Sequence, residues 1–329
     1  GTEELPSSEL KALMDAFGKD LAAALQGARI AFSADPETFA TPRRMAVRID
    51  GVAAAQTAES VEHRGPPVNA AFDADGNPTK AAEGFARRHG VAVAELERRD
   101  TGKAEYLFHT EHQHGQPTVE LLPELVGRVL NELPAKKRMR WGVPGVSFPR
   151  PVHWAVLLFG DESLDAELLG VRTGRATRGH RFHHPAAIDL DRPADYEQRL
   201  LEPGHLVAGF ADREARIREQ VIAAAREAGG EADIDPNLLE EVTSLVEWPV
   251  ALAGRFDRRF LDVPAEALVA VMKDHQKYFP VYDADGALLP AFVTVSNIAS
   301  ADPETVRHGN ERVIEPRFAD AEFFWQQDR

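Results

Sequence analysis

Hydrophobic residues recur at helical spacing at the start of the chain and at several later points. Between residues 7 and 25, Leu10, Leu13, Phe17, Leu21 and Leu25 follow one another every three or four positions, after serines that can cap a helix. Similar amphipathic stretches predict helices at 80–90, 117–133, 212–230, 236–248, 262–279 and 301–329. We expect a break before Pro316 in the last one, because a proline ring clashes with the preceding helical turn.

Stretches rich in β-branched and aromatic residues between turn residues predict the strands. They lie at 28–40 and 43–54 around a turn at Asp35–Pro36, at 102–116 as a hairpin, between 151 and 190, at 205–210, and at 279–295 as a hairpin. The last hairpin is expected to turn at Asp285–Gly286, since Asp-Gly favours tight turns. The hairpin signals and the long capped helices together favour a mainly antiparallel sheet.

The expected fold class is therefore α+β: a multi-module chain with a mainly antiparallel sheet, flanking helices and a small helical subdomain. We predict an N-terminal α/β module at 1–60 and a small helical and hairpin subdomain at 61–116. A larger α+β domain is predicted at 117–329, with strands in 150–210, helices in 212–276, a hairpin at 278–296 and a C-terminal helix.

Composition narrows the function classes. The chain contains no cysteine, which excludes disulfides, thiolate metal ligands and thiol nucleophiles. No apolar run is long enough to cross a membrane and no secretory leader is visible, so we expect a cytoplasmic protein without a membrane partner. The net charge of −15 argues against binding of nucleic acid over the whole surface.

One segment has the opposite charge balance. Residues 136–184 hold two Lys and seven Arg against two Asp and two Glu, a balance of +5. Within this segment Arg172, Arg175, Arg178 and Arg181 recur at every third position. Guanidinium groups bind phosphates through paired hydrogen bonds, so this basic run (residues 172–181) is a candidate surface for a polyanion. The equal alternative is that these arginines pair with carboxylates elsewhere in an acidic chain.

A second basic group lies in the stretch 271–280, VMKDHQKYFP. Lys273 and Lys277 are four residues apart on one helical stripe and can both face solvent or an anion. His275 falls on the apolar stripe with Leu268 and Met272, where we expect an interior histidine. Spacing alone thus indicates a helix end with two free lysines and establishes no chemistry.

Several catalytic signatures are missing from the sequence. We find no phosphate-binding loop, dinucleotide fingerprint, nucleophile elbow or zincin helix, and no histidine is followed directly by aspartate. Histidines cluster at 109, 112 and 114 and again at 180, 183 and 184, but neither group has an obvious local set of carboxylates. We favour structural or solvated histidines there over metal ligands, and predict no catalytic residue and no metal site.

An ordered set of segments resembles a known family. FATPRRMAVRIDG, KKRMRWG, FPRPVHWAVLLFG, TRGHRFHHP, LVEWPVALAGRF, VMKDHQKYFPVYDADG and GNERVIEPRFADAEFFWQQD occur in the order found in the N-terminal half of the β subunit of the bacterial tetrameric glycyl-tRNA synthetase. The resemblance covers essentially the whole chain. It implies part of an ATP-dependent ligase with two α and two β subunits that joins glycine to tRNA(Gly).

The resemblance also implies a division of labour. ATP and magnesium would be bound by the α subunit, and this chain would carry no cofactor and be inactive alone. Its partners would be the α subunit, tRNA(Gly) and a second β subunit. The tRNA-binding candidates are Arg172, Arg175, Arg178, His180, Arg181, Lys273 and Lys277. The alternative is a hydrolase-like module of the aminoacyl-tRNA editing type, which would need the basic run and Lys273 to share a deep pocket.

Overall fold

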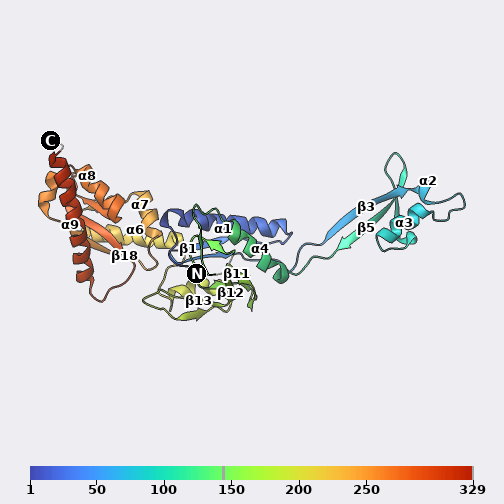
Figure 1. The fold of residues 1–329 in the computed structure, drawn as a ribbon, viewed down its shortest axis with the longest axis horizontal. Coiled ribbons are helices and arrows are strands. Elements are labelled where there is room, and N and C mark those ends of the chain that lie inside the picture. Colours follow the sequence, from blue (N-terminus) through green and yellow to red (C-terminus); the bar gives the residue numbers. More distant parts are fainter. Residues whose placement is uncertain (143–144, 328–329) are drawn as a thin grey trace. The chain divides into compact units, whose positions relative to one another are not determined.

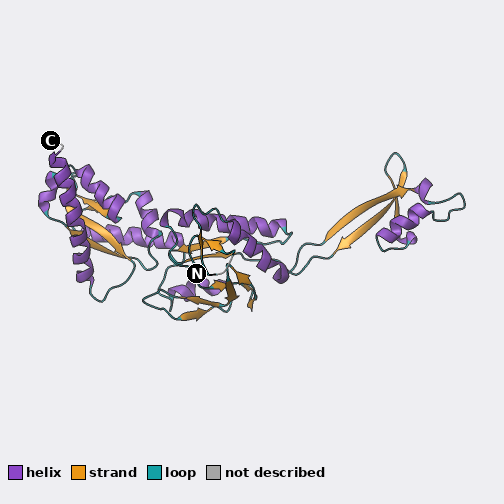
Figure 2. Cartoon of the chain, viewed as in Figure 1, coloured by secondary structure: helices purple, strands orange, loops and turns teal. Residues whose placement is uncertain are grey.

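The computed structural model of the chain describes residues 1–142 and 145–327. Helices and strands are mixed along it, and nearly all neighbouring strands run antiparallel (Figures 1 and 2). One short pair, β8 with β12, is parallel. The predicted α+β class is therefore confirmed. Among the described residues, no helix is both long and apolar enough to cross a membrane.

The elements have the following bounds. The α-helices are α1 Ser7–Gly27, α2 Val68–Ala71, α3 Lys80–Arg88, α4 Thr118–Glu132, α5 Tyr196–Leu201, α6 Phe210–Glu227, α7 Pro236–Thr243, α8 Ala265–Ala270 and α9 Pro303–Gln327. Shorter helical turns are η1 Val93–Glu95, η2 Pro193–Asp195, η3 Arg258–Asp262 and the π-helical η4 Val271–Gln276. The strands of the first half are β1 Glu37–Thr41, β2 Arg44–Arg48, β3 Glu59–Pro67, β4 Glu97–Asp100, β5 Glu105–Gln113, β6 Met139–Arg140, β7 Ser147–Phe148, β8 Ala155–Val156 and β9 Leu158–Phe159. Those of the second half are β10 Glu162–Ser163, β11 Glu167–Leu168, β12 Val171–Gly174, β13 Ala176–Arg178, β14 Ala187–Asp189, β15 Glu231–Ala232, β16 Val250–Arg255, β17 Phe279–Tyr282 and β18 Leu288–Ser296.

The chain packs into two compact units. Unit 1 comprises Gly1–Ala24, Ala34–Asp50 and Leu122–Arg329, and unit 2 comprises Leu25–Ser33 and Gly51–Leu121. These units are defined by packing. The predicted division into three modules at 1–60, 61–116 and 117–329 is a statement about domains and stays a prediction. Residues 143–144 and 328–329 of its last module lie outside the described part of the chain.

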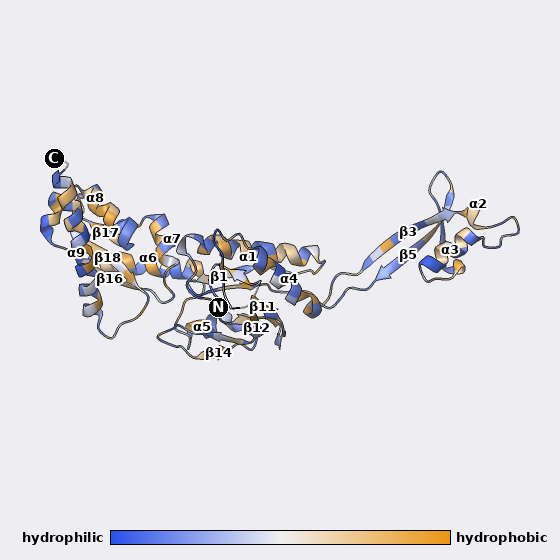
Figure 3. Ribbon diagram, in the orientation of Figure 1, coloured by the Kyte–Doolittle hydropathy of each residue, from blue (hydrophilic) through white to orange (hydrophobic). Residues whose placement is uncertain are grey.

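The most extensive core of unit 1 surrounds a four-stranded antiparallel sheet with the order β15-β17-β18-β16. Successive residues of β18 face opposite ways, as the two-residue repeat of a strand requires. Ala291 and Val293 pack under α6 and α7, whereas Phe292 packs with Ile314 and Phe318 of α9 on the other face. Hydrophobic residues accordingly concentrate on these strands and the facing sides of their helices (Figure 3). The result is a helix–sheet–helix sandwich.

The remainder of unit 1 is built from shorter pieces. The residues of α1 that were predicted to form its apolar stripe are buried, and Leu10 and Leu13 are at most 1% exposed. The hairpin β1–β2 packs its Phe39 against Ile188 and Leu200 of the 176–208 region. The second half of the basic run, with Arg178 and Arg181, lies in this region.

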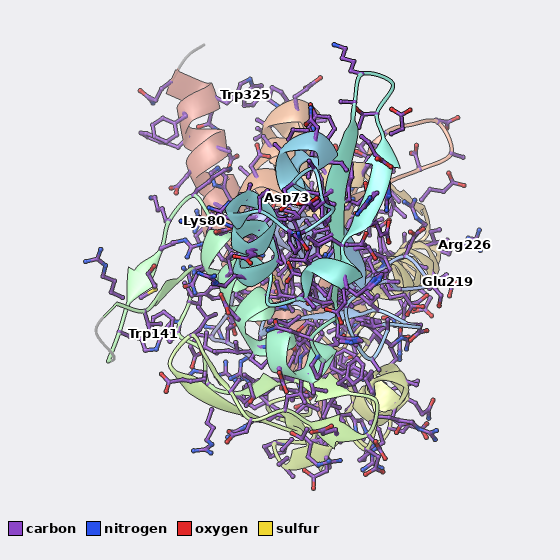
Figure 4. The ribbon with its side chains drawn as sticks, turned by 90° about the vertical axis from the view of Figure 1, so that its right-hand side faces the viewer. Asp73, Lys80, Trp141, Glu219, Arg226 and Trp325 are labelled. Carbon is purple, nitrogen blue, oxygen red and sulfur yellow. The ribbon has the colours of Figure 1, made fainter. Side chains whose placement is uncertain are left out.

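Unit 2 contains the three-stranded antiparallel sheet β3-β5-β4, with α2 and α3 at one end of the long strands (Figure 1). Asp73 lies in the turn before α3, where its carboxylate accepts hydrogen bonds from the backbone N–H groups of Asp75 and Asn77, and Lys80 begins the helix (Figure 4). The main core cluster of this unit has three alanines and two leucines as its fully buried residues, with five partly buried hydrophobic residues packed against them: Ala71, Ala82, Ala86, Leu96 and Leu107, and Val68, Phe72, Phe85, Val91 and Val93.

Four local predictions are wrong. Residues 102–116 form no hairpin of their own, because β5 is a single strand that pairs with β3 on one side and β4 on the other. The turn between the first two strands lies at residues 42–43 and not at Asp35–Pro36, because Thr41 pairs directly with Arg44. Residues 205–209 form no strand, although the Val207 N–H donates to the Glu247 carbonyl. Helix α9 continues through Pro316, since the buried side chains of Ile314 and Phe318 on either side hold both halves in one core.

Candidate nucleic-acid interface

The basic run lies on β12, β13 and the turn that follows, and its four arginines have different environments. Arg172 is exposed and forms an ion pair with Asp165, and Arg181 forms one with Glu4. The half-buried Arg175 donates to the carbonyls of Leu190 (3.3 Å) and Asp161 (3.1 Å). The run therefore does not form a uniform row of free cations.

Arg178 is the arginine of the run that is most available to an anion. It is exposed, and its guanidinium lies 5.6 Å from the centre of the Trp154 ring. No ion pair with a carboxylate is found for it among the described residues. A guanidinium held against an indole keeps its outward N–H groups free for phosphate oxygens.

A buried ion pair fixes the backbone of the run. Arg44 and Glu247 are each 2% exposed, with 3.1 Å between Nε and Oε1. Arg44 also donates to the carbonyls of Arg178 (2.6 Å) and Gly179 (3.4 Å), while Thr41 donates to Glu247 (2.6 Å). Burial alone would raise the pKa of Glu247, but Arg44 and Thr41 outweigh it and hold the pKa below its ordinary value. The carboxylate therefore stays charged and keeps its hydrogen bonds.

His180 fixes the turn from within. Its side chain is fully buried, and its Nδ1 accepts hydrogen bonds from the backbone N–H groups of Phe182 and His183, both at 3.3 Å. Burial lowers the pKa of His180, so the neutral ring is favoured. The burial corrects the sequence interpretation: this histidine is a positioning residue of the turn and is removed from the candidates for direct RNA contact.

Aromatic rings gather beside this turn. The His183 ring lies 5.7 Å from that of His205, which lies 5.6 Å from Trp248, and the guanidinium of Arg216 sits 4.3 Å from the Trp248 ring. Phe182 is 69% exposed at the tip of the turn. We call Phe182, His183, His205 and Trp248 the ring surface. Such rings offer flat faces on which unpaired bases can stack.

The sequence interpretation missed three of the four residues of the ring surface. His205 and Trp248 come from two loops that are distant from the basic run in sequence, and neither lies in a local pattern. Of the ring surface, only His183 was singled out in the sequence, within the histidine group at 180, 183 and 184. Contacts between loops of this kind need the fold before they can be recognised.

The two lysines of the 271–280 stretch are not free. Lys273 pairs with Asp233 (2.5 Å) and Asp235 (3.8 Å), and Lys277 pairs with Glu241 (2.9 Å). The prediction of two unpaired cations is therefore wrong, because the acidic segment 233–241 lies alongside this helix end. His275 is exposed and not interior as predicted, since the π-helical turn η4 changes the angle between successive side chains.

The structure does not bring the basic run and Lys273 into one pocket. A cavity of about 210 Å³ in unit 1 is lined mainly by apolar side chains, including Leu21, Phe39 and Leu157. Neither Lys273 nor any of the four arginines lines this cavity or a second one beside α6, within residues 1–142 and 145–327. The arrangement needed for the hydrolase-like alternative is thus not observed in the described part of the chain.

Comparison with known proteins identifies the family. A family model described as glycyl-tRNA synthetase beta subunit matches residues 1–329. Three relatives named glycine–tRNA ligase beta subunit match 100% of this chain. They come from Marinobacter nauticus, Hahella chejuensis and Cronobacter sakazakii and are 52%, 50% and 49% identical to this chain. The chain spans about half the length of these curated relatives, at 48%, 47% and 48%. The resemblance seen in the sequence is confirmed, and the chain belongs to the glycyl-tRNA synthetase beta subunit family.

Proposed function

We propose that this chain is a non-catalytic part of a glycine–tRNA ligase in the cytoplasm, where it contributes tRNA binding and subunit assembly. The reaction would be ATP-dependent glycylation of tRNA(Gly), in a tetramer with two α subunits and a second β subunit. ATP and magnesium would be held by the α subunit. Family membership supports the reaction class, and the curated relatives are named as beta subunits of that ligase.

The observation that supports tRNA binding is the ring surface beside exposed arginines. RNA-binding proteins combine stacking of unpaired bases on aromatic rings with cationic contacts to the backbone phosphates. Phe182 and Trp248 supply rings, and Arg181 and Arg216 supply guanidinium groups over these rings, while the exposed Arg178 lies in the same basic run. Because the chain has a net charge of −15, such a confined basic patch would also orient an approaching RNA.

The test uses the complete β subunit together with the α subunit. Phe182→Ala removes an exposed ring without touching the buried Arg44–Glu247 pair. We expect the KM for tRNA to rise about tenfold, because base stacking on one ring contributes about 1–3 kcal/mol. The value of kcat should change little, since no reacting atom is contacted.

Two controls separate binding from folding and assembly. Val313→Ala removes another exposed apolar side chain, on α9 and outside the ring surface, and should leave the KM unchanged. Co-purification of the α subunit with each variant measures assembly. An unchanged KM in Phe182→Ala would rule out the ring surface as a tRNA contact, and a lost α subunit would assign Phe182 to assembly instead.

A further inference from the structure

Three segments of unit 2 bring histidines and a glutamate together. His63 on β3 lies directly opposite His109 on β5 in the strand register. Glu111 is two residues further along β5 and so projects from the same face of the sheet as His109. His89, the residue that caps the C-terminal end of α3, reaches this face from the helix. The four side chains therefore meet where α3 ends against the long hairpin.

The donor atoms of three of these residues converge. One ligand atom each from His63, His89 and Glu111 lies within 4.8 Å of the other two. The Nε2 of His63 is 3.2 Å from Oε2 of Glu111, and the rings of His63 and His89 are 4.3 Å apart. The His109 ring is 5.3 Å from that of His89. Three donor atoms this close to one another can all face one point between them.

The donor set suits a transition metal. Imidazole nitrogens and a carboxylate oxygen are preferred ligands of Zn²⁺, and three protein ligands leave one tetrahedral position for water or a further side chain. His109 is the neighbouring imidazole, with its ring 5.3 Å from that of His89 and 6.5 Å from that of His63. Calcium and magnesium prefer oxygen ligands alone, so two imidazoles argue against both. His63 and His89 are half-buried and Glu111 is exposed, so an ion could enter from solvent.

The architecture of unit 2 gives such an ion a role. The fully buried side chains of its core cluster are three alanines and two leucines, and the larger hydrophobic side chains packed against them, such as Phe72 and Phe85, are only partly buried. Small units with weak cores are commonly stabilised by metals or disulfides, and this chain has no cysteine. We propose that His63, His89 and Glu111 bind a divalent transition-metal ion, with Zn²⁺ as the best fit, which fastens the end of α3 to the β3–β5 hairpin. The competing explanation is a metal-free His63–Glu111 hydrogen bond with neighbouring stacked rings.

The direct test is calorimetric titration of the chelator-treated chain with Zn²⁺. We expect one strongly bound ion per chain. His63→Ala and His89→Ala should each weaken its binding more than about tenfold, because even supporting residues of metal sites contribute roughly that much. Cobalt substitution provides a second readout, since the intensity of its visible absorption distinguishes a tetrahedral from an octahedral site.

Matched histidine controls locate the site. His112→Ala changes a neighbouring histidine on β5, and His183→Ala changes one in the ring surface of unit 1. Both should keep the strong site. Binding that is lost in His183→Ala but kept in His63→Ala would overturn the proposal, as would the absence of a strong site in the unsubstituted chain.

One further variant distinguishes a lost zinc ligand from a misfolded chain. Glu111→Gln keeps the size and an oxygen of an exposed side chain, so the fold should be retained while zinc binding weakens. Hydrogen exchange of α3 and β5 should slow on adding Zn²⁺ to the unsubstituted chain, because a ligand that binds only the folded state stabilises it. Equal exchange with and without bound zinc would contradict the fastening role.

Discussion

At the scale of single residues, the buried Arg44–Glu247 pair determines whether the basic run keeps its shape. Arg44→Met leaves the Glu247 carboxylate buried without its cation, so the free energy of unfolding should fall by about 3–5 kcal/mol. Urea denaturation followed by circular dichroism measures this loss. The double variant Arg44→Met/Glu247→Leu removes both charges and should recover much of it. If the free energy of unfolding of Arg44→Met falls by less than about 1 kcal/mol, the buried pair does not stabilise the fold as its geometry implies.

His180 adds a dependence on pH at the same place. Its pKa in the folded chain is lowered from 6.5 by burial, with a repulsive contribution from His183 that is opposed by Glu247. The folded state therefore binds fewer protons than the unfolded state, and stability is fully present above pH 6.5 and lost as the pH falls through the folded pKa.

His180→Asn tests this sign. The asparagine oxygen can still accept the N–H groups of Phe182 and His183, but it does not titrate. Between about pH 7 and about pH 5, the melting temperature of this variant should decline less steeply than that of the unsubstituted chain. His184→Asn, which changes a neighbouring half-buried histidine, is the control. Parallel pH profiles for the unsubstituted chain and His180→Asn would show that the buried ring does not contribute.

The candidate residues illustrate what spacing can predict. Three of the four arginines in the three-residue repeat, Arg172, Arg178 and Arg181, are exposed, which fits a surface. Which carboxylate meets which cation could not be read from the sequence. Glu4 lies far from Arg181 along the chain, and the acids at 233–241 reach Lys273 and Lys277 only through the fold.

At the scale of elements, local sequence signals predicted an element correctly where residues at its own ends supply the cap or the turn. Helix α7 begins after Asp235, whose carboxylate accepts from the N–H groups of Asn237 (2.8 Å) and Leu238 (3.1 Å) with Pro236 at the first position. The hairpin turn at Asp285–Gly286 also lies where predicted, between β17 and β18. Packing decided the exceptions, as at Pro316 inside α9.

The cap of α7 gives a prediction for an element. Asp235→Ala should lower the free energy of unfolding by about 0.5–2 kcal/mol, because two N–H groups lose their acceptor. Asp233→Ala is the matched control, since it removes the 2.5 Å ion pair with Lys273 but leaves the cap. That loss should be about 0–1 kcal/mol, as for other partly exposed pairs. Urea denaturation measures both losses of unfolding free energy. Equal losses in the two variants would show that the cap contributes no more to stability than the ion pair.

At the scale of the whole molecule, composition and ordered motifs predicted the class and family but not the packing units. The segment Leu25–Ser33 joins Gly51–Leu121 in unit 2, and no composition change marks this discontinuity. The same limit applies to the proposed metal site. His63, His89 and Glu111 are 26 and 22 residues apart, far outside a local ligand motif, and only strand register and the end of α3 bring them together.

The different environments of Arg175 and Arg178 allow a final test of tRNA binding by the complete β subunit. Arg178 is exposed over Trp154, whereas Arg175 is bound to two backbone carbonyls. If Arg178 contacts a duplex phosphate, Arg178→Ala should weaken tRNA binding and reduce its log–log salt slope by about 0.9, with the melting temperature unchanged. Arg175→Ala should mainly lower the melting temperature, because it leaves carbonyl groups without donors.

Binding isotherms at several salt concentrations, with thermal unfolding in parallel, separate the two effects. Since phosphate contacts carry little sequence information, Arg178→Ala should weaken binding of tRNA(Gly) and of other tRNAs by similar factors. An unchanged slope together with a lower melting temperature in Arg178→Ala would mean that its contact with Trp154 is structural. In that case the basic run would belong to the fold and not to an RNA interface, and the ring surface alone would have to account for tRNA binding.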